Sequence, residues 1–232
     1  MKHNYKHIIF DLDRTLWDFD KSSEETFMEM YSIFELEKKG IDNAKTFFGN
    51  YQKINDKYWA LYRENKISKS DLNVRRFEES LLLYVIPDRI LAKEMATYYL
   101  EHSPFKKNLF PYTIELLSYL KTKYKLHILT NGFKEVQHNK MQANGLTSYF
   151  DNLFTSEDAG ILKPSPTAFE FALKNIGANV GECIMIGDDY KVDILGAKNI
   201  GMDQIFVNFN NVSGNFISTY IVSSLKEIQL IL

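Results

Sequence analysis

The stretch Ile8-Ile9-Phe10-Asp11-Leu12-Asp13-Arg14-Thr15 places an apolar run directly before two carboxylates. A continuous apolar run is typical of a strand covered on both faces, as in a parallel sheet flanked by helices. Alternate side chains leaving such a strand point the same way, so Asp11 and Asp13 repel each other unless a cation lies between them. A hard divalent ion such as Mg²⁺ meets that need, and a surface Asx turn is the ordinary alternative.

Further apolar runs extend this pattern along the chain. They are Leu126–Leu129, Leu153–Thr155, Ile184–Ile186 and Ile205–Val207. Helix-period segments separate them, and this alternation predicts an α/β fold with a Rossmann-like three-layer core around a parallel sheet.

One interval, residues 17–105, lacks a strand pattern and is rich in Phe, Tyr, Leu and Met at helical spacing. Helix starts are predicted at a capping box of Ser22 and Glu25, at Ser68 with Asp71, and after Pro87-Asp88. A further helix, between the first two of these starts, is expected to carry apolar and aromatic residues from Phe47 to Leu61. We therefore expect an inserted all-α domain of four helices over residues 17–105. The catalytic core is then expected to comprise residues 1–16 and 106–232.

Composition excludes several classes of protein. The net charge is −2 with both signs interspersed, which disfavours binding to a nucleic acid polymer. Cys183 is the single cysteine and lies in an apolar run, so we expect a buried thiol rather than a disulfide or a cysteine zinc site. No run approaches the roughly 18 apolar residues of a membrane span, and Met1–His7 lacks an apolar signal core. A soluble, cytoplasmic protein is expected.

Polar groups also follow the later strands. Thr130-Asn131-Gly132 combines a hydroxyl, an amide and backbone N–H groups before a helix expected near Phe133, which suits a phosphate. Lys163-Pro164-Ser165-Pro166 places a cation before a helix capped at Ser165. Gly187-Asp188-Asp189 adds acids, with Asp193 beyond, and Gly196-Ala197 is expected to let the next helix approach the sheet closely. Taken singly, each segment also fits a capping turn or a solvated charge.

In this order and spacing, the four segments resemble the signature motifs of the haloacid dehalogenase superfamily of phosphohydrolases, and the resemblance covers essentially the whole chain. The helical insert resembles the helical cap of that superfamily. The likeness implies a Mg²⁺-dependent phosphatase acting through an aspartyl phosphate.

Residue roles follow from that resemblance. It implies Asp11 as the nucleophile and Asp13 as the general acid and base. The metal would be held by the Asp11 carboxylate, the Asp13 backbone carbonyl and Asp188, with Asp189 and Asp193 acting through water or on the direct ligands. Which acid near Asp188 touches the metal is left open. The phosphoryl group would be bound by Thr130, by the Asn131 and Gly132 amides and by Lys163, with Thr15 steadying the first loop.

Two segments, Leu16–Phe19 and Thr130–Gln137, resemble the bacterial pyrimidine 5'-nucleotidases of this superfamily more closely. That likeness implies hydrolysis of nucleoside monophosphates such as UMP, dUMP and dTMP. Arg14 departs from the pattern, because relatives often have His there. Residues that could contact the base or steer the phosphate are Trp17, Phe19, Tyr58, Trp59, Tyr62, Arg75 and Arg76. Each could instead belong to a bundle core or a solvated face.

Other activities also fit the motifs. A phosphatase acting on phosphoglycolate or a sugar phosphate, or a phosphosugar mutase, would retain both Asp11 and Asp13. Dehalogenase chemistry is disfavoured, since it has no need of an acid at Asp13. A non-catalytic module that binds phosphometabolites is disfavoured because clustered carboxylates cost stability without a metal. The sequence leaves the oligomeric state open.

Overall fold

A computed structural model describes residues 4–232, and the chain forms two compact units. One unit contains the described residues through Phe19 together with Lys107–Leu232. The other is Asp20–Lys106. Each unit has its own apolar core, so each is described separately.

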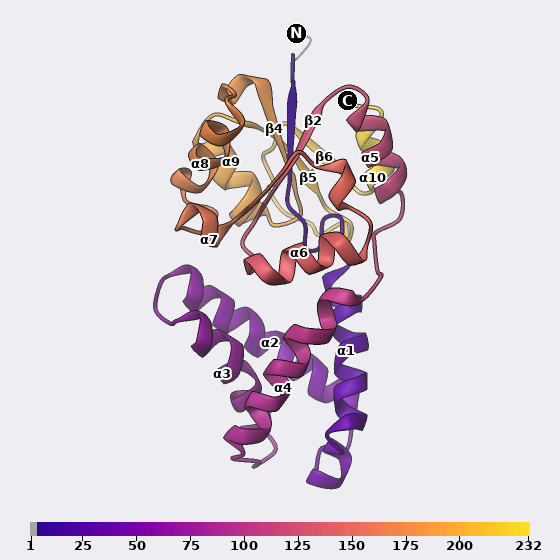
Figure 1. Ribbon diagram of the computed structural model, residues 1–232, viewed down its shortest axis with the longest axis vertical. Coiled ribbons are helices and arrows are strands. Elements are labelled where there is room, and N and C mark those ends of the chain that lie inside the picture. The colour runs from indigo at the N-terminus through magenta and orange to yellow at the C-terminus, as the bar shows by residue number, and fades with distance from the viewer. Residues whose placement is uncertain (1–3) are drawn as a thin grey trace. The chain divides into compact units, whose positions relative to one another are not determined.

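The first unit is built on a parallel sheet of six strands in the order β3-β2-β1-β4-β5-β6 (Figure 1). The strands are β1 His7–Phe10, β2 Lys125–Thr130, β3 Asn152–Thr155, β4 Cys183–Gly187, β5 Asp203–Val207 and β6 Tyr220–Val222. All five predicted strands are present, and Cys183 is a buried free thiol as expected.

The sixth strand, β6, was not predicted from the sequence. It has three residues, pairs only with β5, and leaves Ile221 exposed, so it shows no continuous apolar run. Its identity as a strand depends on pairing with an edge that exists only after the sheet has formed.

Helices cover both faces of the sheet, which confirms the three-layer α/β prediction. The apolar cluster on one face includes side chains of α5 Thr113–Lys121, α6 Lys134–Ala143 and α10 Leu225–Ile228. The cluster on the other face includes α8 Pro166–Ile176 and α9 Leu195–Asn199, and a short helix, α7 Ser156–Ala159, follows β3. Ser165 precedes α8 with Pro166 at its first turn, as predicted.

The second unit is helical, as predicted for the inserted segment. Its main helices are α1 Phe19–Ile33, which begins at the last residue of the first unit, α2 Ala44–Arg63, α3 Lys69–Leu82 and α4 Arg89–His102. Short 3₁₀ turns at Leu36–Lys39 and Ser103–Phe105 complete it. Its core is aromatic, with the Phe27 and Tyr51 ring centroids 4.1 Å apart.

Two predicted helix starts in this unit are confirmed and one is wrong. The capping box of Ser68 and Asp71 is present, and Asp88 caps α4. The capping box predicted at Ser22 and Glu25 is wrong, because α1 already begins at Phe19 and Ser22 is buried inside it, where its carbonyl accepts from Thr26 Oγ1 at 2.8 Å.

Gly196 and Ala197 were expected to let the next helix approach the sheet closely, and Ala197 is fully buried in the apolar cluster that contains Ile9 and Met185 of the sheet. A Cβ atom at Gly196 would lie 2.6 Å from the ring of Phe169 and 3.2 Å from the Cα of Pro164. Gly196 itself therefore also allows the close approach of α8 and of the turn before it.

Among residues 4–232, no helix has the length and apolar character that crossing a bilayer requires.

A histidine pair is buried inside the sheet unit. His7 Nδ1 and His127 Nε2 are 3.0 Å apart, and the Asn152 amide is 3.0 Å from His127 Nδ1. Burial, with the neighbouring His7, lowers the pKa of His127 to about 4, and burial also lowers the pKa of His7. The folded state therefore favours the neutral form of His127.

We expect this pair to make folding sensitive to acid. Because the folded-state pKa of His127 lies below its unfolded value, its contribution is complete above about pH 6.5 and is lost as the pH falls toward about 4, by up to about 3 kcal/mol. Urea unfolding of wild type and H127Q across this range measures the difference. The exposed H138Q variant is the control and should follow wild type; identical pH profiles for H127Q and wild type would contradict the assignment.

Candidate active site

The predicted polar groups gather at the carboxyl ends of three adjacent strands. Asp11 follows β1, Thr130 ends β2 and Asp188 follows β4. The backbone N–H of Asp11 donates to Ile186 O at 2.9 Å, which extends the β1–β4 pairing up to the first acid. Ligands of open α/β sheets bind at this edge.

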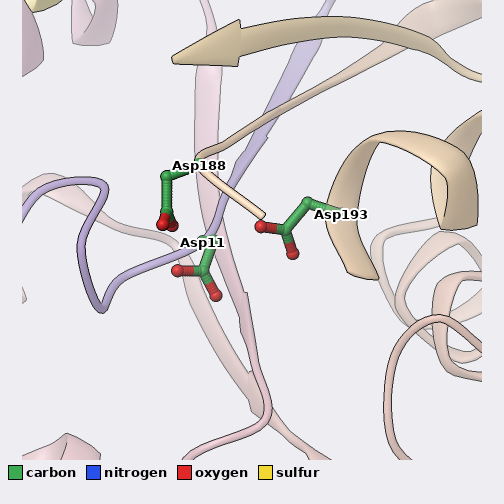
Figure 2. A group of neighbouring side chains, drawn as sticks. All are labelled: Asp11, Asp188 and Asp193. Atoms are coloured by element: carbon green, nitrogen blue, oxygen red, sulfur yellow. The ribbon is translucent and has the colours of Figure 1, made fainter. Parts of the chain in front are cut away.

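Three carboxylates form one cluster at this edge. Oxygens of Asp11, Asp188 and Asp193 all lie within 4.8 Å of one another, and Figure 2 shows the three side chains directed toward a common point. Asp11 comes from the end of β1, Asp188 from the end of β4, and Asp193 from the π-helical turn Tyr190–Ile194. An all-oxygen donor set of this kind suits a hard divalent cation.

Lys163 supplies the positive charge inside the cluster. Its Nζ lies 2.7 Å from Asp11 Oδ1 and 2.7 Å from Asp193 Oδ1, and the side chain is 1% exposed. Burial alone would lower the pKa of Lys163, but the two carboxylates outweigh burial and raise it. Lys163 is therefore held as a cation.

One lysine does not neutralise the three acids, of which Asp11 and Asp193 are buried and Asp188 is half-buried. Burial, together with neighbouring carboxylates, raises the pKa of Asp11 and of Asp193 despite the opposing attraction of Lys163. Burial and the nearby Asp193 raise the pKa of Asp188 to about 7. The cluster thus lacks positive charge, and a divalent cation would supply it.

Thr15 links two of the acids. Its hydroxyl is 3.0 Å from Asp188 Oδ1 and 3.5 Å from Asp11 Oδ2, and the residue is fully buried. The side chain joins the loop after β1 to the loop after β4, in keeping with the predicted role in steadying the first loop.

Asp189 and Asp193 have different surroundings. The carboxylate of Asp189 caps the following turn by accepting from Lys191 N at 2.9 Å and Val192 N at 3.0 Å, and the residue is exposed. Asp193 faces the cluster, and its Oδ2 also accepts from Asp189 N at 3.2 Å. Gly187 leaves room for the Asp193 carboxylate, since a Cβ at Gly187 would lie 2.4 Å from Asp193 Oδ2.

The Thr130-Asn131-Gly132 loop is tied to Lys163 and to itself. The Asn131 side chain accepts from Lys163 N at 2.8 Å and donates to Lys163 O at 2.9 Å, which fixes the lysine backbone. Gly132 N donates to Thr130 Oγ1 at 3.1 Å. Helix α6 begins at Lys134, after Phe133 as the capping residue, close to the predicted start.

The carboxylate of Asp13 points to α6 rather than into the acid cluster. Lys140 Nζ lies 2.5 Å from Asp13 Oδ1, and Gln137 Nε2 donates to Asp13 Oδ2 at 2.9 Å. Neither Gln137 nor Lys140 was predicted as a site residue from the sequence. The sequence did hold a signal for them: they are three residues apart, which puts both on one face of the helix that follows Thr130-Asn131-Gly132.

The aromatic and arginine candidates have varied environments. Trp17 is buried and Phe19 half-buried, with ring centroids 6.2 Å apart in the first unit. In the helical unit, Arg75 is half-exposed and pairs with Asp71. Arg76 is buried among aromatic rings and donates to Asn55 Oδ1 at 2.8 Å, so a solvated pair of arginines is excluded. Half-buried positions on α2 are occupied by Tyr58, Trp59 and Tyr62.

A family model described as haloacid dehalogenase-like hydrolase matches residues 5–201, so the chain belongs to that family and is a hydrolase. The resemblance inferred from the motifs is thereby confirmed.

Similar proteins indicate which kind of hydrolase this chain is. The chain is 30% identical to the pyrimidine 5'-nucleotidase YjjG of Escherichia coli, over 97% of this chain and 96% of the relative. It is 28% identical to a glyceraldehyde 3-phosphate phosphatase of Methanothermobacter thermautotrophicus, over 98% of this chain and 99% of the relative. The HAD-hydrolase YfnB of Bacillus subtilis, solved bound to magnesium and described as revealing interdomain movement, matches with a TM-score of 0.89 and 25% identity over 99% of both chains. Family and relatives support a phosphoric monoester hydrolase.

Replacing Lys163 with methionine should strongly destabilise the metal-free protein. The change leaves the buried carboxylates without their cation, which costs about 3–5 kcal/mol of unfolding free energy. The loss should be larger at about pH 8 than at about pH 5, because acids with raised pKa values take up protons and lose their mutual repulsion. Urea unfolding in EDTA measures it.

The matched control is K134M. Lys134 lies on α6 and pairs with Asp158 at the surface, so its removal should change stability little at either pH. Equal stability losses for K163M and K134M would contradict the buried ion-pair assignment.

Proposed function

We propose that this chain is a phosphatase that hydrolyses phosphoric monoesters through an aspartyl phosphate on Asp11, with pyrimidine nucleoside 5'-monophosphates such as UMP, dUMP and dTMP as substrates. The observation that carries the proposal is the buried cluster in which Asp11 and Lys163 meet Asp188 and Asp193 at the sheet edge. A carboxylate beside a buried cation can attack an anionic phosphoryl group that would otherwise repel it.

The cluster fits a divalent cation, and we propose Mg²⁺. Asp11, Asp188 and the backbone carbonyl of Asp13 would hold it directly, and Asp189 and Asp193 would act through water or on those ligands. The donor set is all oxygen and short of positive charge, as Mg²⁺ requires. When bound, the ion would neutralise negative charge on the transferring phosphoryl group.

In the first half-reaction, an Asp11 carboxylate oxygen attacks phosphorus as the bond from phosphorus to the ester oxygen breaks. Asp13 gives its proton to that oxygen, and the nucleoside leaves as a neutral alcohol. Lys163, the Thr130 hydroxyl and the Asn131 backbone amide bind the phosphoryl oxygens, and the Gly132 amide, which donates to Thr130 Oγ1, orients that hydroxyl.

In the second half-reaction, a water molecule attacks the phosphorus of the acyl phosphate. Asp13, now a carboxylate, takes a proton from that water as the bond between phosphorus and the Asp11 oxygen breaks. Inorganic phosphate leaves, and both aspartates return to their starting protonation states.

We further propose that the helical unit is a cap that moves during turnover. Both chain connections to it leave the first unit as a paired ribbon, in which Asp18 N donates to Asn108 O at 2.8 Å and Trp17 bridges to Leu109. Such a pair can bend without disturbing the sheet. The interdomain movement described for YfnB supports this proposal.

The nucleotide preference rests on the likeness to YjjG and on the motif residues around Trp17 and Thr130. A second candidate is a sugar phosphate, favoured by the glyceraldehyde 3-phosphate phosphatase of similar identity. Both candidates use the same acid cluster and differ only in the alcohol that leaves.

Phosphate release is expected with Mg²⁺ and UMP, dUMP or dTMP, and much less from purine nucleotides, phosphoglycolate or glyceraldehyde 3-phosphate. D11N should lower kcat by at least about 1,000-fold while its thermal unfolding stays cooperative, because the nucleophile is lost. Equal turnover of unrelated esters would refute the preference for pyrimidine nucleotides. A D11N variant with near wild-type kcat would refute the aspartyl-phosphate mechanism.

Mg²⁺ should raise the thermal midpoint more at about pH 8 than at about pH 6, since metal ligands must be deprotonated and the pKa of Asp188 is about 7. Differential scanning fluorimetry with and without the ion measures the two shifts. D188N should lose most of the stabilisation at both pH values, whereas a shift in D188N equal to that of wild type would argue against this site.

A further inference from the structure

We propose that Gln137 and Lys140 of α6 are positioning residues that hold the general acid Asp13 and set the hydrogen-bond direction of Thr130. The inference rests on the proposed phosphatase function and adds two residues to its site. Both oxygens of the Asp13 carboxylate are engaged by this one helix.

Lys140 is buried, and its surroundings restrict the conformations of its side chain. It is 3% exposed, and its Nζ lies 4.2 Å from the ring centroid of Trp17 and 5.7 Å from that of Phe19. The aromatic rings restrict the lysine chain while attracting its charge. The ammonium group therefore defines one location for Asp13 Oδ1.

Gln137 is fully buried and uses its amide nitrogen twice. Nε2 lies 2.9 Å from Asp13 Oδ2 and 2.7 Å from Thr130 Oγ1. The amide thus presents its N–H side to both Asp13 and Thr130, and both oxygens accept from it. The opposite atom, Gln137 Oε1, is buried without a hydrogen-bond partner among the described residues. This orientation costs free energy, and the contacts of Nε2 must offset it.

The same amide determines what Thr130 can do. Its hydroxyl oxygen accepts from Gln137 Nε2 and from Gly132 N, at 2.7 and 3.1 Å. Two lone pairs are then occupied, and the hydroxyl proton must point away from both donors. Thr130 is thereby prepared as a hydrogen-bond donor, which is the role that a phosphoryl oxygen needs.

Local geometry explains why these residues act together. Gln137 and Lys140 are three apart on α6, so they lie on one face of the helix. Gly132 is required beside them, because a Cβ there would lie 2.3 Å from Gln137 Nε2. The phosphate loop and the acid Asp13 are thus oriented by one rigid element.

The test for Lys140 compares leaving groups. A nucleoside alkoxide needs a proton to leave, whereas 4-nitrophenolate does not, so loss of the oriented acid should harm the two esters unequally. K140M should lower kcat/KM about 100-fold for UMP and less than about 10-fold for 4-nitrophenyl phosphate. K140R keeps the charge and should retain most of the wild-type ratio between the esters. K134M, the surface lysine of the same helix, should match wild type.

Two further variants separate positioning from general structural damage. In a D13N background, adding K140M should change kcat/KM for UMP by less than about twofold, because the residue it positions is already disabled. Q137M should raise the inhibition constant of inorganic phosphate about 5–10-fold through the unrestrained Thr130 hydroxyl, and K140M should leave that constant unchanged within about twofold.

The inference is overturned if K140M slows both esters equally, if its full effect persists with D13N, or if Q137M leaves phosphate inhibition unchanged. Circular dichroism and thermal midpoints verify folding, and Q137M tests the inference if K140M does not fold. A wild-type protein without Mg²⁺-dependent phosphate release would instead refute the proposed function itself, which keeps the two failures distinct.

Discussion

The mutual repulsion of three clustered carboxylates, two buried and one half-buried, is the constraint on which the rest of the site depends. Asp11, Asp188 and Asp193 share one small region with a single buried cation, Lys163. Isolated acids at this depth would remain protonated, so the arrangement persists only where cations and hydrogen bonds compensate. Thr15, the Asn131 clamp on the lysine backbone and the missing side chain at Gly187 all serve that compensation.

The parallel sheet makes such a cluster possible. Its strands end together, so loops from distant parts of the chain bring their side chains to one edge without crossing the core. The pairing of β1 with both β2 and β4 places the nucleophile candidate at the centre. Helix α6 adds a second polar arrangement beside the first, in which Asp13 is held outside the acid cluster and close to the phosphate loop. This separation of the two aspartates supports the proposed roles, with Asp11 as nucleophile and Asp13 as acid.

Much of the fold could be predicted because its signals are local. Continuous apolar runs gave five strands, and capping residues such as Ser68 and Asp88 gave helix starts. The failures have a common cause. The strand β6 depends on pairing with β5, and the early start of α1 at Phe19 leaves Ser22 buried inside a packed unit, so neither feature has a local signal. The burial of Arg76 likewise has no local signal, since the aromatic rings around it come from three different helices.

The sequence by itself determined five of the six strands, the inserted helical segment and the identity of the chemical groups, because each depends on a short-range pattern or motif. Only the tertiary structure decided which of those groups contact one another. It joined Asp193 with Asp11 and Asp188, turned Asp189 to cap its own turn, and brought Gln137 and Lys140 to Asp13 across more than a hundred residues of chain. Such contacts depend on side-chain direction and packing, which no local pattern specifies.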